Sequence, residues 1–138
     1  MAAKKVFISY DHSEDLRYKN LLRAWHGHAA FEFEFDQRSP NLPINSEDGA
    51  KVKQSLTRMM KGAKYLLVIV GKKSHKSKWM NWEIERAKMS DTKLKLVAVK
   101  IERSYITPAG LLGCGTAFAM GFEHEKILEA LSMAGNNY

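Results

Sequence analysis

Residues 65–70 read Tyr-Leu-Leu-Val-Ile-Val, an unbroken apolar run that ends at Gly71. A strand with no polar face has to be covered on both sides, as in parallel sheets, whereas a strand with one wet face alternates apolar and polar residues. The run is far shorter than the roughly 20 apolar residues that a membrane-spanning helix requires. It therefore predicts a central strand of a parallel sheet with helices packed on both faces.

The segments on either side of this run alternate between strand and helix periodicity. Residues 5–10 and 94–101 are further apolar, strand-like segments. Residues 31–36 read Phe-Glu-Phe-Glu-Phe-Asp, and this strict alternation predicts a strand with one wet face near an edge of the sheet. Two segments carry apolar residues at helical spacing: Tyr18, Leu21, Leu22 and Trp25, then Val52, Leu56, Met59, Met60 and Ala63. The candidate N-caps are Asp11 or Ser13 for the first helix, Asn45 or Ser46 for the second, and Ser77 for a third that runs to about Met89.

The last part of the chain, from residue 102 on, is punctuated by glycines. It predicts an irregular segment with room for one more strand, followed by a helix over residues 123–133. Strands joined by helical crossovers form parallel sheets. We therefore predict an α/β fold, a flavodoxin-like three-layer sandwich whose parallel sheet has the strand order 2-1-3-4-5, as a single domain over residues 1–138.

The composition of the 138 residues excludes several classes of protein. Hydrophobic residues make up 45% of the chain, which is enough for a core and argues against intrinsic disorder. Neither a signal-peptide pattern nor a long apolar run is present, so we expect a cytoplasmic protein with no membrane partner. Cys114 is the only cysteine, which excludes an intrachain disulfide and a cysteine-rich metal site. His26 and His28 have no third ligand nearby in sequence, so we expect no metal.

The formal net charge of +7 leaves two interpretations open. It favours a polyanionic or phosphate-bearing partner, but it equally fits a soluble basic surface without any partner. Nucleic-acid binding has only the charge in its support, and we do not predict it. A receiver-like phosphoacceptor shares the strand order, but it needs an aspartate at the end of the third strand, where this chain has Val70 and Gly71.

Ligands of such sheets bind beyond the carboxyl ends of the strands, near the point where the strand order reverses. Three segments of this sequence are predicted to meet there. They are Ser9-Tyr10-Asp11 after the first strand, Asp36 to Ser39 after the second, and residues 71–82 after the third.

Glu83 is the candidate catalytic residue of the third helix. Trp79 and Ala87 lie four residues before and after it, so all three share one helix face. Glu85 lies about 200° around the axis and is expected to face solvent. A carboxylate on a partly apolar face is costly unless it has partners or a function. The pattern alone leaves open whether Glu83 is functional or pairs with a neighbour such as Arg86 or Lys88.

Two motifs resemble a known family. Residues 6–15, Val-Phe-Ile-Ser-Tyr-Asp-His-Ser-Glu-Asp, resemble the opening strand and turn of TIR domains. Residues 71–87 resemble their catalytic helix, in which a tryptophan precedes the catalytic glutamate by four residues. The likeness covers residues 4 to about 101 and is to the TIR-like family that includes the NAD-cleaving subunit of Thoeris antiphage systems. The chain departs from animal-type TIR domains in its loop after the second strand and in its glycine-punctuated tail.

This resemblance implies roles for particular residues. The family's catalytic glutamate falls on Glu83 and not on Glu85. The segment from Asp36 to Ser39 corresponds to the loop beside the nucleotide pocket. The resemblance implies that the substrate-binding residues are Ser9, Tyr10, Asp11, Asp36, Ser39 and Trp79. The cations that could hold a pyrophosphate, unless they form only a solvated loop, are Lys72, Lys73, Lys76 and Lys78.

The resemblance also implies an activity. NAD is expected as the substrate, with no further cofactor, and cleavage of its nicotinamide–ribose bond gives a cyclic nucleotide, a conjugate or free ADP-ribose. We expect an ADP-ribose-derived, cyclic signal in antiphage defence, acting on a separate effector protein, and a homo-oligomer is compatible with this. The alternative is a catalytically silent TIR-like interaction module.

Overall fold

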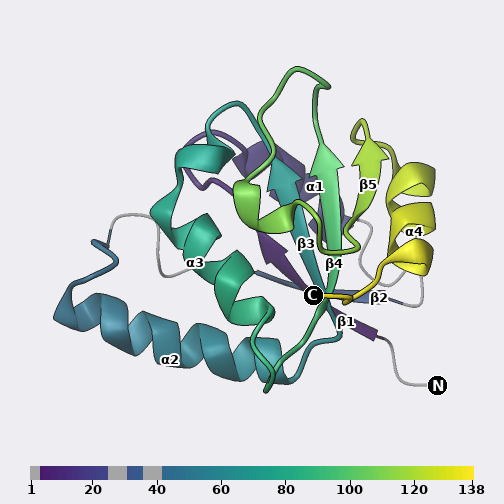
Figure 1. Ribbon diagram of the computed structural model, residues 1–138. Coiled ribbons are helices and arrows are strands. Elements are labelled where there is room, and N and C mark those ends of the chain that lie inside the picture. Colours follow the sequence, from purple (N-terminus) through teal and green to yellow (C-terminus); the bar gives the residue numbers. More distant parts are fainter. Residues whose placement is uncertain (1–3, 25–30, 36–41) are drawn as a thin grey trace.

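The computed structural model in Figure 1 describes residues 4–24, 31–35 and 42–138. Within these ranges, five parallel strands form one sheet in the order β2-β1-β3-β4-β5. The strands are β1 (Lys4–Ser9), β2 (Phe31–Phe35), β3 (Tyr65–Val70), β4 (Lys95–Lys100) and β5 (Ala117–Met120). The predicted α/β class and the strand order 2-1-3-4-5 are confirmed.

Helices cover both faces of the sheet, which makes three layers (Figure 1). The α-helices are α1 (Leu16–Ala24), α2 (Glu47–Lys61), α3 (Lys78–Ala87) and α4 (His124–Met133), and the short 3-10 helices are η1 (Ser74–Lys76) and η2 (Ala109–Leu111). One core cluster joins α2 and α3 to the sheet through Leu56 and Ile84. The other joins α1 and α4 to its opposite face through Leu22 and Ile127.

Strand β3 is the centre of the molecule. All six of its residues are buried, and they alternate between the two clusters: Leu66 packs toward α2 and α3, and Leu67 packs toward α1 and α4. Residues 65–70 are all apolar because helices cover both faces of β3. The strand-order reversal lies at β1 and β3, whose carboxyl ends meet the turn before α1 and the start of α3.

Two of the three predicted helix starts carry a predicted cap, whereas α1 begins at Leu16, so the prediction of Asp11 or Ser13 as its N-cap was wrong. Ser46 caps α2, because its Oγ accepts a hydrogen bond from the amide of Gly49 at 2.9 Å. Ser77 caps α3 through the amide of Met80, as expected. The turn between β1 and α1 is closed by Asp11, whose Oδ1 accepts from both the amide and the hydroxyl of Ser13.

Helix α1 departs from its predicted apolar stripe. Leu22 is fully buried, but Leu21 is exposed, and Trp25 lies outside the described residues. The inward face instead runs through Asp15, Lys19 and Leu22, which are spaced by four and three residues and are all buried. The prediction that Leu21 packs against the sheet was wrong, because α1 turns a partly polar face toward the sheet.

The glycine-punctuated tail contributes an edge strand. β5 pairs in parallel with β4, and Gly121, with a φ of 114°, then leads the chain into α4. The C-terminus returns to the sheet, where Gly135 forms a bridge to Leu96 and the Tyr138 hydroxyl donates to the carbonyl of Leu94. Among the described residues, no helix has both the length and the apolar character that a bilayer crossing requires.

Candidate functional site

Glu83 lies on α3 with its carboxylate turned inward. Glu83 is only 3% exposed. The hydroxyl of Ser9, the last residue of β1, donates a hydrogen bond to Oε1 of Glu83 at 2.8 Å. Ser9 itself is fully buried. The bond joins residues 74 positions apart in the chain. It therefore holds one carboxylate oxygen of Glu83 at the carboxyl end of β1.

The neighbouring charges on α3 have other partners. Glu85 is exposed, as expected, and lies 3.4 Å from Lys88. Arg86 makes two hydrogen bonds of 2.7 Å to Asp91, and this guanidinium is the main cause that lowers the pKa of Asp91 to about 2. Arg86 and Lys88 thus each contact a carboxylate other than that of Glu83.

A small cavity of about 70 Å³ lies beside Glu83. It sits at the reversal of the strand order, between the turn after β1 and the start of α3. Its lining residues are Tyr10, Asp11, His12, Ser13, Ser77, Trp79 and Glu83. Pockets for drug-sized ligands usually measure about 300–1,000 Å³. The described walls therefore enclose room for only a fragment of a dinucleotide, next to the carboxylate.

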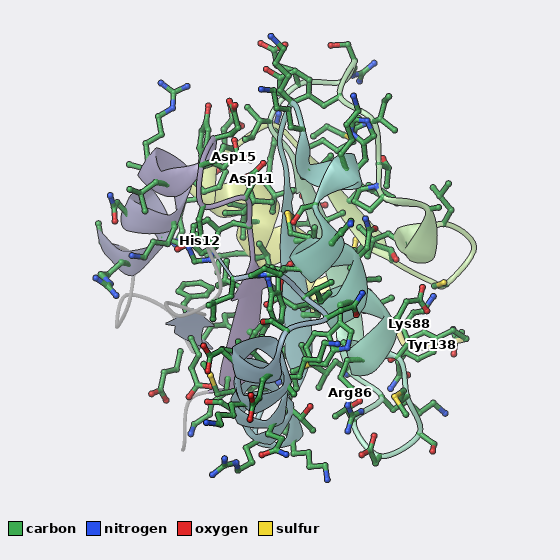
Figure 2. The ribbon with its side chains drawn as sticks, turned by 90° about the vertical axis from the view of Figure 1, so that its left-hand side faces the viewer. Asp11, His12, Asp15, Arg86, Lys88 and Tyr138 are labelled. Carbon is green, nitrogen blue, oxygen red and sulfur yellow. The ribbon has the colours of Figure 1, made fainter. Side chains whose placement is uncertain are left out.

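The turn after β1 brings an aromatic pair to this cavity. Tyr10 is buried and stacks on His12 with ring centroids 4.2 Å apart, and its hydroxyl lies 3.3 Å from Nδ1 of that ring. Figure 2 labels Asp11 and His12 on this turn. Tyr10 and Asp11 line the cavity as expected, whereas Ser9 lies behind it and reaches Glu83 instead. His12 was missed as a site residue, although its place directly after Tyr10-Asp11 could have indicated it.

Trp79 forms the wall of the cavity on α3. It is partly buried, and its indole Nε1 donates to the carbonyl of Leu42 at 2.8 Å. Its ring meets Trp82 edge to face at 6.0 Å. The hydrogen bond to Leu42 ties α3 to a position three residues after Ser39, the last residue of the predicted nucleotide loop. The two predicted loop residues, Asp36 and Ser39, lie outside the described residues.

The lysines before and at the start of α3 are exposed to solvent, namely Lys72, Lys73, Lys76 and Lys78. Lys73 lies 3.2 Å from Glu14, and Ser77 lines the cavity while it caps α3. The first amides of α3 thus point toward the same end of the sheet as the cavity, with lysines beside them. This arrangement is suited to an anion, because helix N-termini carry partial positive charge.

No group of three or more histidine, cysteine, aspartate or glutamate residues is arranged to hold a metal ion in the described part of the chain. The hydroxyl of Ser77 is used in the N-cap of α3, where it accepts from the amide of Met80. The thiol of Cys114 is buried and lies against the carbonyl oxygens of Gly110 and Leu112. The chemical groups on the described walls of the cavity are therefore the buried carboxylate of Glu83, the carboxylate of Asp11, an imidazole, a phenol, an indole and two serine hydroxyls.

A comparison with protein-family models matches residues 7–105 to the TIR-like domain of the Thoeris protein ThsB. This match covers well over half of the chain, from β1 to the segment after β4, and contains every described residue of the cavity. The chain belongs to this family. No curated protein matches it. The matched range agrees with the resemblance seen in the sequence over residues 4 to about 101. Strand β5 and helix α4 of this chain lie after the matched range.

Proposed function

We propose that this TIR-like chain is an NAD-consuming enzyme of Thoeris antiphage defence that cleaves the nicotinamide–ribose bond with Glu83 as its catalytic carboxylate. The supporting observation is the buried Glu83 carboxylate, held by Ser9 and placed on the wall of a cavity at the strand-order reversal. Membership in the ThsB family supplies the biological context.

The physical chemistry of the bond suits such a carboxylate. When the bond between the ribose C1′ and the nicotinamide nitrogen breaks, its electron pair leaves with nicotinamide and the sugar becomes oxocarbenium-like. A fixed negative charge beside C1′ lowers the free energy of this state, as carboxylates do in glycoside hydrolysis. Burial strengthens the effect, because the surroundings of Glu83 screen charge less than water does.

The second step consumes the sugar cation. A nitrogen of the same molecule's adenine can attack C1′ and lose a proton, which gives a cyclic product, or water can attack and give ADP-ribose. We favour the cyclic product, which acts on a separate effector protein. The stacked pair of Tyr10 and His12 forms part of the cavity in which this capture takes place.

Substitution of the two glutamates of α3 tests the assignment. We expect wild-type protein to release nicotinamide from NAD, Glu83→Gln to lower the rate by roughly 100-fold or more, and Glu85→Gln to retain it, since Glu85 is exposed and points away. Nicotinamide and the nucleotide product are measured by chromatography and mass spectrometry, in purified protein and in extracts of phage-infected cells that express it.

Two outcomes contradict the proposal. Equal loss of activity in both variants shows that Glu83 has no special role. Absence of any NAD turnover, both in the purified protein and in infected cells, favours the alternative of a catalytically silent TIR-like interaction module.

A further inference from the structure

A second carboxylate is buried at the same end of the sheet but outside the cavity at Glu83. Asp15, at the start of α1, is only 4% exposed, and its Oδ2 atom has no hydrogen-bond partner among the described residues. The nearby Lys73 is paired with Glu14. Figure 2 shows Asp15 close to Asp11 at this end of the molecule. Asp15 is therefore a buried acceptor whose second oxygen is unsatisfied.

The backbone leaves space for this carboxylate. A Cβ added to Gly71, just after β3, would lie 2.0 Å from Oδ2 of Asp15. The carboxylate thus rests against the bare Cα of a glycine at the carboxyl end of the central strand. Burial is the main cause that raises the pKa of Asp15 to about 6; the charges of Asp11 and Glu14 add to it, and the charge of Arg17 opposes it. At neutral pH the group is mostly ionised, and an ionised carboxylate in such a place is costly without a donor.

A cavity of about 300 Å³ adjoins Asp15. Its walls are the start of α1 and the segment after β4, and it shares no lining residue with the cavity at Glu83. The lining residues are Glu14, Asp15, Arg17, Tyr18, Ile101 and Tyr105. Its volume reaches the lower end of the range for small-molecule pockets, and it lies beyond the strand ends, where ligands of parallel sheets bind.

The charges of this cavity select its ligand. Arg17 is the one cation on its wall, and its guanidinium is engaged with Tyr18, over whose ring it lies at 4.7 Å and to whose hydroxyl it donates. No ion pair within 4.0 Å joins Asp15 to a described basic side chain. Opposite the acidic side, Ile101 and Tyr105 offer an apolar surface and an aromatic ring.

We propose that this cavity binds a small organic ammonium ion, with its N–H groups donating to Asp15 and its apolar or aromatic body against Tyr105 and Ile101. A charge-assisted hydrogen bond from the ligand stabilises the ionised carboxylate of Asp15, and the ring of Tyr105 is attractive to a cation. An anion meets two carboxylates on the same wall and is repelled. The inference goes beyond NAD cleavage and uses none of the residues assigned to it.

Three probes with one ring and different charge test the inference. Tyramine carries an ammonium group, p-cresol is neutral and phloretate carries a carboxylate. We titrate each into the full chain and follow its amide NMR spectrum. We expect tyramine to shift the amides of Asp15, Ile101 and Tyr105 with a millimolar dissociation constant, and the other two probes to bind roughly tenfold more weakly or not at all.

Matched variants assign the effect to one carboxylate. Asp15→Asn keeps the shape and removes the charge, and it is expected to weaken tyramine binding about tenfold. Asp48→Asn, at an exposed position in the first turn of α2, is expected to leave binding unchanged. The same spectra report whether each variant is folded. Should Asp15→Asn fail to fold, Tyr105→Leu tests the other wall, where loss of the ring is expected to weaken binding.

Three results overturn the inference. They are equal binding of all three probes, undiminished tyramine binding by folded Asp15→Asn or Tyr105→Leu, and no amide shift at about 50 mM tyramine, which is far above a millimolar dissociation constant. NAD turnover is measured separately, so failure here is distinguishable from failure of the proposed activity.

Discussion

At the scale of single residues, two buried polar groups dominate this end of the sheet, and their surroundings differ. Glu83 has a donor, Ser9, at 2.8 Å, whereas Oδ2 of Asp15 has none among the described residues. A satisfied buried carboxylate is held in one geometry, while an unsatisfied one lowers the stability of the fold once it ionises. The two residues therefore call for different experiments.

The hydroxyl of Ser9 is expected to matter for turnover more than for substrate binding. Ser9 is fully buried and does not line the cavity, so it acts through the position of Glu83. We predict that Ser9→Ala lowers kcat for nicotinamide release by roughly tenfold and leaves KM nearly unchanged. Ser90→Ala, at an exposed position after α3, is the control. A rise in KM at constant kcat would show that Ser9 acts in substrate binding.

Asp15 is expected to make stability depend on pH. Its pKa is raised from 3.8 to about 6 in the folded protein, so folding favours the protonated form. The stability that Asp15 contributes is complete below about pH 4 and is lost as the pH rises through 6, by at most about 3 kcal/mol. Urea unfolding at about pH 4 and about pH 7.5 should show this loss in wild type and a smaller one in Asp15→Asn. An identical pH dependence of both proteins contradicts the prediction.

At the scale of elements, the end of β3 and the start of α1 fit together through a glycine. A Cβ at Gly71 would lie within 2.5 Å of three atoms of the Asp15 carboxyl group, so a larger residue requires the Asp15 side chain or the start of α1 to move. The same elements carry the turn that lines the cavity at Glu83. Their packing thus influences both cavities.

We predict that Gly71→Ala lowers the free energy of unfolding by about 1–3 kcal/mol, because the added methyl group overpacks this contact. Gly62→Ala, at the end of α2, is the matched control, since a Cβ there meets its nearest atom at an ordinary 3.6 Å. Urea unfolding measures both. The double variant Asp15→Ala with Gly71→Ala should recover part of the loss, and strict additivity would show that the two residues do not compete for space.

At the scale of the whole molecule, the last residues hold elements that lie far apart in the chain. The Tyr138 hydroxyl donates to the carbonyl of Leu94, just before β4, and lies 3.4 Å from the carbonyl of Ala87, the last residue of α3. Burial is the main cause that raises the pKa of Tyr138 to about 12. The C-terminal segment therefore contacts the end of α3, the helix that carries Glu83.

We predict that Tyr138→Phe lowers the free energy of unfolding by about 1 kcal/mol and the melting temperature by roughly 3–5 °C, because it removes a hydrogen-bond donor to the buried start of β4. Thermal unfolding followed by circular dichroism measures the change. Tyr105→Phe is the control, since Tyr105 makes no hydroxyl bond to the described residues. Equal melting temperatures for Tyr138→Phe and wild type contradict the role of this bond.

Local patterns in the sequence were sufficient to identify the strands β2 and β3 and the inward face of α3. The apolar run of β3, the alternation of β2 and the four-residue spacing of Trp79 and Glu83 follow from burial acting on neighbouring residues. Periodicity failed on α1, where Leu21 is exposed and Asp15 is buried. Charged residues at buried positions carry no periodic signal, so the polar inward face of α1 was not visible in the sequence.

The sequence by itself therefore determined the α/β class and the side of α3 on which Glu83 lies, because each of these depends on residues within one or two helical turns or strand repeats. The strand order was predicted from the fold class, and the structure confirms it. Only the tertiary structure decided which groups meet: Ser9 with Glu83, Gly71 with Asp15, and Tyr138 with Leu94. Such pairs are brought together by the packing of whole elements, and no local spacing specifies the partner of a side chain more than 40 residues away.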